Sequence, residues 1–182
     1  SQETVPSSGW KIEKVSDRKV RDEWKPLWGK RAVVEDHFNE LVIDLVNPAG
    51  QPERMQLVVR GYNDGFAFCY KIPDGEGPRV NVQSELTAYN FAGDYTAWFY
   101  NGENHNIGPE KLTETDGTRL PVMTVKAGDK HYMAIHEACL ETGAPLVLQS
   151  KGGESLFSVA SKPTSLSPGY TSAWRVVLYG TT

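Results

Sequence analysis

Short runs of apolar residues, alternating with polar ones and separated by turn residues, recur along most of this chain. Alternation with a period of two is typical of half-buried strands, and no helical stripe exceeds about two turns. Pairs such as Asn47-Pro48, Asp64-Gly65 and Gly77-Pro78 indicate turns. The pattern predicts an all-β fold, a β-sandwich of about ten short strands. The strands are expected at residues 38–46, 55–60, 66–72, 80–91, 120–125, 131–138, 146–149, 156–160 and 174–179.

Two segments depart from this pattern. Residues 1–23 are polar and charged, and they are predicted to be an N-terminal segment outside the core, either an edge strand or a frayed entry with a solvated face. A single β-sandwich domain is then expected over residues 24–182. Residues 98–120 are poor in aliphatic side chains and rich in Asn, Gly and Glu, which predicts a long surface loop.

Composition excludes several classes of protein. The chain has 182 residues, a net charge of −4 and a pI near 5.6, which argue for one domain and against a nucleic-acid surface. No apolar run approaches the roughly 20 residues that cross a bilayer. Cys69 and Cys139 lack the spacing of a zinc site, and both fall in apolar strands, so two buried free thiols are favoured over one disulfide.

The chemically richest stretch is residues 131–140, HYMAIHEACL. In a strand, Glu137 shares a face with Met133 and Ile135, whereas His136 points to the opposite face. A buried carboxylate is costly, so Glu137 needs a cation, a group of hydrogen-bond donors or a partner surface. Calcium takes six to eight oxygen ligands, so one Glu cannot hold it alone. No complete catalytic constellation is present in the sequence.

Aromatic side chains suggest sugar binding at two further places. Trp24 and Trp28 could form a stacking platform, although plugging a sheet edge is the simpler interpretation. Trp98 and His105, in the Asn- and Gly-rich segment, could stack on and hydrogen-bond to a sugar, with a solvated loop as the simpler interpretation. Arg60 and Asp64, which flank the predicted hairpin turn, are interpreted as an ion pair that holds the fold.

Five segments, in order, resemble the amino-terminal domain of glycoside hydrolase family 97, the α-glucosidase and α-galactosidase family common in gut Bacteroides. Residues 59–70 are similar to the family's Arg-x-Tyr-x-Asp-Gly-x-Ala-Phe-Arg-Tyr hairpin, although Cys69 replaces the Arg. Residues 135–140 are similar to its His-Glu-Ala-x-Leu signature. The other three likenesses are Trp24–Leu41 to Trp-x-x-x-x-Gly-Glu and Tyr-Asn-Glu, Ser84–Trp98 to Glu-x-Thr and Asp-x-x-x-Trp, and Ala173–Val177 to Pro-Trp-Arg.

The resemblance implies a β-super-sandwich like that of galactose mutarotase, packed on a (β/α)8 catalytic barrel that carries the acid and base carboxylates. It implies that Glu137 is lent to an active-site calcium, that the substrate is an oligosaccharide, and that the protein is periplasmic or secreted. His136, Trp98 and His105 are the candidate substrate-binding residues. The family's first strands are mostly missing upstream of Trp24, so a sandwich truncated at its N-terminal strands, or a diverged stand-alone relative, is expected.

Two alternatives to this accessory, non-catalytic domain stay open. One is a stand-alone carbohydrate-binding module that uses Trp24, Trp28 or Trp98 as stacking platforms. The other is a mutarotase-like epimerase in which His105, His131 or His136 acts with a Glu as an acid–base pair; the motifs favour the hydrolase over this alternative.

Overall fold

The computed structural model describes residues 9–50, 52–75, 78–102, 106–141, 145–160 and 162–182. Within these residues the regular secondary structure is all β-strand apart from one short 3-10 helix, η1 (Leu112–Glu114), and no helix is long and apolar enough to cross a membrane. The strands are β1 (Lys11–Trp24), β2 (Val34–Val46), β3 (Arg54–Tyr62), β4 (Gly65–Lys71), β5 (Val80–Val82), β6 (Ala88–Asn90), β7 (Thr96–Tyr100), β8 (Asn106–Lys111), β9 (Asp116–Ala127), β10 (His131–Ala138), β11 (Leu148–Lys151), β12 (Leu156–Val159), β13 (Thr164–Leu166) and β14 (Trp174–Thr181).

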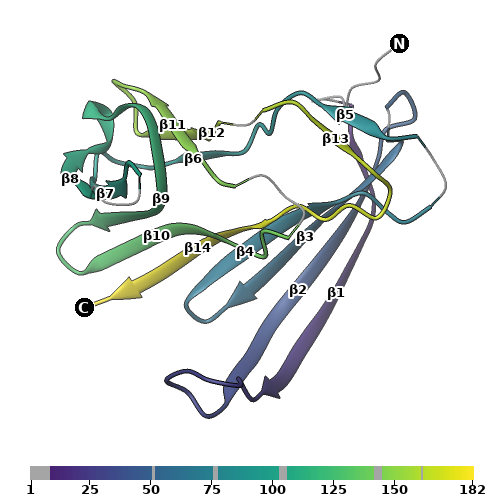
Figure 1. The fold of residues 1–182 in the computed structure, drawn as a ribbon, viewed down its shortest axis with the longest axis horizontal. Coiled ribbons are helices and arrows are strands. Elements are labelled where there is room, and N and C mark those ends of the chain that lie inside the picture. Colours follow the sequence, from purple (N-terminus) through teal and green to yellow (C-terminus); the bar gives the residue numbers. More distant parts are fainter. Residues whose placement is uncertain (1–8, 51, 76–77, 103–105, 142–144, 161) are drawn as a thin grey trace.

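The strands form two layers, which confirms the predicted all-β sandwich. The large sheet has the order β1-β2-β3-β4-β14-β10-β9, with β7 also paired to β9 and β8 paired to β7. The second layer contains β11, β12 and β6, with a separate β13–β5 pair beside it (Figure 1). Strand β9 belongs to both layers, because Asp116–Arg119 pairs with β11 whereas Met123–Ala127 pairs with β10.

The main core lies between the layers near this shared strand. It is built from side chains that alternate along β7, β9, β10, β11 and β12, as expected for sheets that each bury one face. The Phe99 and Phe157 rings, from opposite layers, meet with their centroids 5.6 Å apart. The buried members are Ala97, Phe99, Leu112, Met123, Val125, Ile135, Leu146, Leu148, Phe157 and Val159.

A second buried cluster lies on the other face of the large sheet. The pairing places Glu40, Arg60, Ala67 and Val176 in one row across β2, β3, β4 and β14. His136 of β10 is in the same row, so this face is opposite to the one that carries Ile135. Glu40 is only 4% exposed and accepts hydrogen bonds from Arg18 Nε at 2.6 Å and Arg60 Nε at 2.8 Å.

The Arg60 guanidinium is covered by aromatic rings, which explains how it is tolerated in this cluster. Its central carbon lies 4.3 Å from the centroid of the Phe38 ring and 4.5 Å from that of Trp174, distances at which a cation is attracted to a ring face. Arg60 therefore holds the fold as expected, but its partner is Glu40 rather than the predicted Asp64.

The structure overturns one sequence prediction, decides between two alternatives in a second and corrects part of a third. The predicted loop at residues 98–120 is wrong, because this segment contains most of β7, all of β8 and η1, and the start of β9. Although it has few aliphatic residues, its Phe99 and Leu112 side chains are buried. Residues 11–24 form the edge strand β1, paired along its length with β2 and mostly exposed. Both cysteines are free, but Cys139 is exposed and only Cys69 is buried.

Candidate functional site

Strand β10 directs the Glu137 carboxylate into the space between the layers. Ile135, two residues earlier on the same face, is 1% exposed and belongs to the main core. The Glu137 side chain itself is 8% exposed. The alternation predicted from the sequence is thus confirmed, and the core lies on the Glu137 side of the strand.

The carboxylate is held by one backbone donor and one cation. The Leu146 N–H donates to Glu137 Oε2 at 2.5 Å, and Arg175 Nη1 donates to the same oxygen at 3.5 Å. Arg175 reaches this position because it is the register partner of Glu137 in the β10–β14 pair. Within the described residues, both of these hydrogen bonds therefore fall on Oε2, one of the two carboxylate oxygens.

Arg175 is bound much more tightly to a different carboxylate. Its Nε and Nη2 donate to Glu85 Oε1 at 3.0 Å and Oε2 at 2.5 Å, a bidentate arrangement. Burial alone would lower the pKa of the Arg175 guanidinium, but the hydrogen bond and charge of Glu85, with smaller contributions from Tyr89 and Glu137, together outweigh burial and raise the pKa. In formal charges, Glu85 neutralises Arg175, and the negative charge of Glu137 is left over.

Tyrosines of both layers surround this charged group. The Tyr70 hydroxyl lies 3.1 Å from Thr87 Oγ1. Burial raises the pKa of the Tyr89 hydroxyl to about 12; the smaller effect of the Arg175 charge opposes this rise, and that of Glu85 adds to it. The Tyr89 oxygen is buried and has no hydrogen-bond partner within the described part of the chain. A polar atom without a partner in a buried charged cluster is uncommon in native structures.

The predicted substrate-binding residues are not gathered around Glu137. His136 is exposed and lies on the opposite face of β10. Trp98 pairs with Thr124, which pairs with Ala134, so Trp98 is also on that opposite face of the large sheet. His105 lies outside the described residues. His131 is at the far end of β10, where its Nδ1 lies 2.5 Å from the Tyr179 hydroxyl.

Sequence reasoning missed Arg175, the charged partner of Glu137, and Glu85, the second carboxylate that Arg175 binds. Arg175 and Glu85 both fall in segments that carry the family likeness, but neither was assigned a role. The spacing could not reveal them, because 38 residues separate Arg175 from Glu137 and 90 separate it from Glu85. The signal available in the sequence is Arg175 itself, which stands in an apolar strand between Trp174 and Val176, because an Arg is almost never fully buried without a partner.

The site can contribute one ligand to a metal ion but cannot hold the ion by itself. Among the described residues no group of three or more His, Cys, Asp or Glu side chains is arranged to bind a metal. A carboxylate is the oxygen ligand that calcium prefers, and the surplus negative charge of Glu137 suits a cation. The residues present therefore fit calcium only if its remaining ligands come from a partner surface.

Comparisons with known proteins place this geometry in a family. The chain matches the family described as Glycosyl-hydrolase 97 N-terminal over residues 3–182. It is 28% identical over 154 residues to a probable retaining alpha-galactosidase of Streptomyces bingchenggensis, a match covering 75% of this chain and 24% of that protein.

Solved structures share the fold. A glycoside hydrolase family 97 enzyme from Pseudoalteromonas sp. strain K8, in complex with acarbose, is similar with a TM-score of 0.83 and 24% identity, covering 96% of this chain and 28% of that one. A beta-arabinopyranosidase is similar with a TM-score of 0.80 and 18% identity, covering 94% of this chain and 32% of that one. This chain spans a quarter to a third of the length of these relatives, and it belongs to the family of amino-terminal domains of glycosyl hydrolase 97.

Proposed function

We propose that this chain is the accessory amino-terminal domain of a family 97 α-glycosidase, that it packs on a (β/α)8 catalytic barrel, and that Glu137 is one ligand of the calcium in the active site. The domain does not hydrolyse glycosides alone, because the acid and base carboxylates belong to the barrel. A periplasmic or secreted location and an oligosaccharide substrate complete the proposal and rest on family resemblance.

The arrangement of Glu85, Arg175 and Glu137 is the observation that carries this proposal. Glu85 binds Arg175 through two short hydrogen bonds, whereas Glu137 is 3.5 Å from the nearest Arg175 nitrogen. A cation is therefore the natural complement of Glu137. The Leu146 N–H fixes Oε2 and with it the orientation of the carboxylate. Bound calcium would polarise the substrate and orient a catalytic carboxylate or water.

Calorimetric titration of calcium into the polypeptide that carries both domains tests the proposal. We expect Glu137→Gln to weaken calcium binding by at least about tenfold, because calcium affinity depends on the number of negatively charged ligands and the substitution removes one of them. Titration of calcium into the 182-residue chain alone should release no heat of binding, since this chain supplies a single calcium ligand. Equal calcium affinity in the wild type and Glu137→Gln would refute the assignment of Glu137.

Exposed tryptophans favour a second candidate function, a stand-alone carbohydrate-binding module. Trp24 is 55% and Trp28 is 88% exposed, as a stacking platform requires. Titration of the 182-residue chain with maltooligosaccharides separates the two functions. Saturable binding that Glu137→Gln leaves unchanged would favour the module, whereas an accessory domain without its barrel should bind no sugar.

The mutarotase-like alternative finds less support. It needs a His close to a Glu, but His136 and Glu137 lie on opposite faces of β10, and His131 contacts Tyr179 instead. Among described residues, the His–carboxylate contact within 4 Å is that of His37 Nδ1 and Glu35 Oε2, 3.8 Å apart in the exposed part of β2.

A further inference from the structure

The loop that joins β1 to β2, residues 25–33, presents large apolar side chains to solvent. Leu27 is 101% exposed and Trp28 is 88% exposed, and Trp24 at the base of the loop is 55% exposed. We call residues 25–33 the hairpin tip. Single exposed apolar residues are ordinary, but adjacent Leu and Trp side chains with this exposure are typical of an interaction site.

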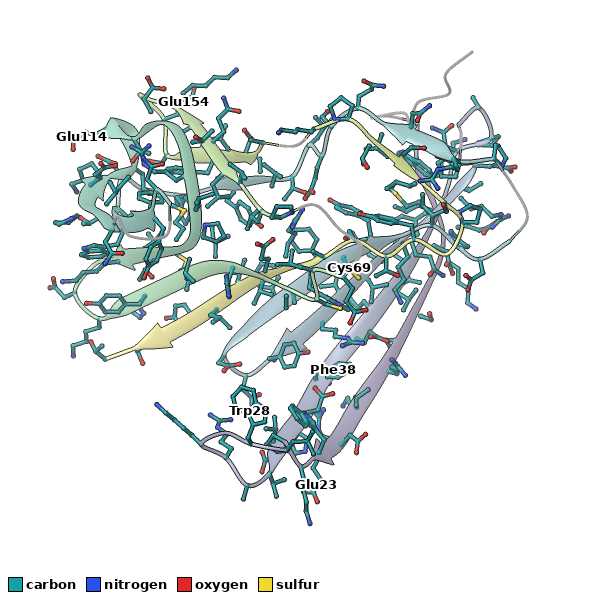
Figure 2. The ribbon with its side chains drawn as sticks, in the orientation of Figure 1. Glu23, Trp28, Phe38, Cys69, Glu114 and Glu154 are labelled. Atoms are coloured by element: carbon teal, nitrogen blue, oxygen red, sulfur yellow. The ribbon has the colours of Figure 1, made fainter. Side chains whose placement is uncertain are left out.

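The tip extends away from the rest of the domain. Strands β1 and β2 have 14 and 13 residues, more than twice the usual length of about 5–6. Their tip end runs beyond the other strands of the large sheet and beyond the second layer, and Trp28 lies there with Glu23 (Figures 1 and 2). No described segment of this chain covers Leu27 or Trp28, as their exposure shows.

The tip carries cations, and its base carries acids. Lys25, Lys30 and Arg31 lie within residues 25–33, whereas two register pairs of acids, Asp22–Asp36 and Glu23–Glu35, lie at the strand ends next to them. Around an apolar centre, charges of both signs suit a protein surface with complementary charges better than a surface of one sign. A sugar platform has no use for Leu27, which can neither stack on a ring nor hydrogen-bond to hydroxyls.

The surface beside the tip is shaped and polar. A hollow of about 220 Å³ is lined by side chains of β1, β2 and the β3–β4 turn, including Arg21, His37, Tyr62 and Asn63. Imidazole, amide and phenol groups at the foot of an apolar projection suit a protein surface, which offers both hydrogen-bonding partners and pockets. An anionic lipid surface would attract the cations of the tip but would repel the acids at its base.

We infer, on the basis of the proposed function, that the hairpin tip inserts Leu27 and Trp28 into an apolar pocket of the catalytic barrel and so anchors the two domains. The solved enzymes that resemble this domain have more than two thirds of their chain outside it, so a large partner surface is present in proteins of this kind. Trp residues in central, desolvated pockets dominate the energy of such interfaces.

Amide hydrogen exchange, compared between the 182-residue chain and the polypeptide with both domains, tests this inference. Residues 25–33 lie outside the strand ladders, so they should exchange quickly in the isolated domain and at least about tenfold more slowly when docked. If other surfaces of the domain are protected but the tip is not, the domain packs on the barrel and the anchor is refuted. If no surface is protected, the proposed packing fails as well.

Substitutions separate docking from folding. In the two-domain polypeptide, the double variant Leu27→Ser/Trp28→Ser should lose the protection and make the two domains unfold separately. The same variant should leave the melting temperature of the 182-residue chain unchanged, because both side chains are already in water. Ile12→Thr is the matched control, since Ile12 is 65% exposed at the opposite end of β1 from the tip and Thr keeps the branched Cβ, and it should change neither readout.

Two other ligands would overturn the inference. Tip protection that appears in the 182-residue chain on adding maltooligosaccharide would make the tip a sugar platform. Binding of the chain to anionic phospholipid vesicles, abolished by Leu27→Ser/Trp28→Ser, would make it a membrane anchor. If the two domains of the double variant still unfold together, as in the wild type, the anchor is also refuted.

Discussion

At the scale of single residues, the buried carboxylate of Glu40 links stability to pH. Burial alone would raise its pKa, but hydrogen bonds from Arg18 and Arg60 outweigh burial and hold the pKa below the usual 4.5. A carboxyl whose pKa is depressed by folding stabilises the native state above its unfolded pKa. This contribution is lost as the pH falls below 4.5 through the folded value.

Glu40→Gln should therefore lower the free energy of unfolding at pH 7 by about 1–3 kcal/mol, because Arg60 loses its anion while it stays between two rings. As the pH is lowered from about 5, the variant should also lose less stability than the wild type, because it lacks the one carboxyl whose pKa is lowered by folding at this position. Urea unfolding at several pH values measures both effects. Glu13→Gln is the control: Glu13 pairs with Arg54 at the exposed sheet edge, and a change as large as that of Glu40→Gln would contradict the argument.

At the scale of strands and turns, Gly65 shows how closely β4 and β14 approach. A Cβ on Gly65 would lie 2.1 Å from the Val177 carbonyl oxygen, which belongs to the backbone and cannot move aside freely. Gly65→Ala should therefore cost roughly 2–4 kcal/mol of unfolding free energy. Gly61, at the other side of the same hairpin, would place its Cβ 3.9 Å from the Asn39 carbonyl oxygen.

Gly61→Ala is consequently the matched control for Gly65→Ala, and it should shift stability by less than about 1 kcal/mol. Equal costs of the two substitutions, measured by urea unfolding, would show that backbone flexibility rather than the β4–β14 contact decides the effect. The sequence predicted Gly65 as half of an Asp-Gly turn, whereas the structure places it as the first residue of β4.

The elements show where sequence reasoning succeeds and where it fails. Alternation located β2, β3, β4, β10 and β14 well, because these strands bury one face and carry branched or aromatic residues. It failed for residues 98–120, whose strands β7 and β8 contain few aliphatic side chains. Their burial comes from long-range packing such as that of Phe99 on Phe157, which no local window can report.

The candidate site was predicted only in part for the same reason. The burial problem of Glu137 follows from strand alternation alone, and of the predicted solutions, a cation, hydrogen-bond donors or a partner surface, the described residues supply the Leu146 N–H and the distant Arg175. Its partner Arg175 comes from another strand, and Glu85, the carboxylate that Arg175 binds more tightly, comes from another layer; only the strand order brings the three together. The sequence alone indicates that a buried carboxylate needs a partner, but the order of the strands in the fold determines which residue that partner is.

At the scale of the whole molecule, Arg175 connects the two layers. It extends from β14 of the large sheet to Glu85, which lies between β5 and β6, and its side chain is 4% exposed. Arg175→Met would leave two carboxylates, with side chains 17% and 8% exposed, next to each other without a cation. Removing the charged partner from a buried pair costs about 3–5 kcal/mol, so this variant should be strongly destabilised.

Glu85→Gln should cost less, about 1–3 kcal/mol, because Arg175 can then turn its charge to Glu137, which is already 3.5 Å away. The order of the two costs, measured by urea unfolding of the 182-residue chain, tests whether Glu137 carries surplus charge. Adding Glu137→Gln to Arg175→Met should recover part of the loss, since one of the two unpaired carboxylates disappears. If Glu85→Gln were as damaging as Arg175→Met, Glu137 could not replace Glu85 as the partner of Arg175. The view of Glu137 as the carboxylate left for a cation would then lose its physical basis.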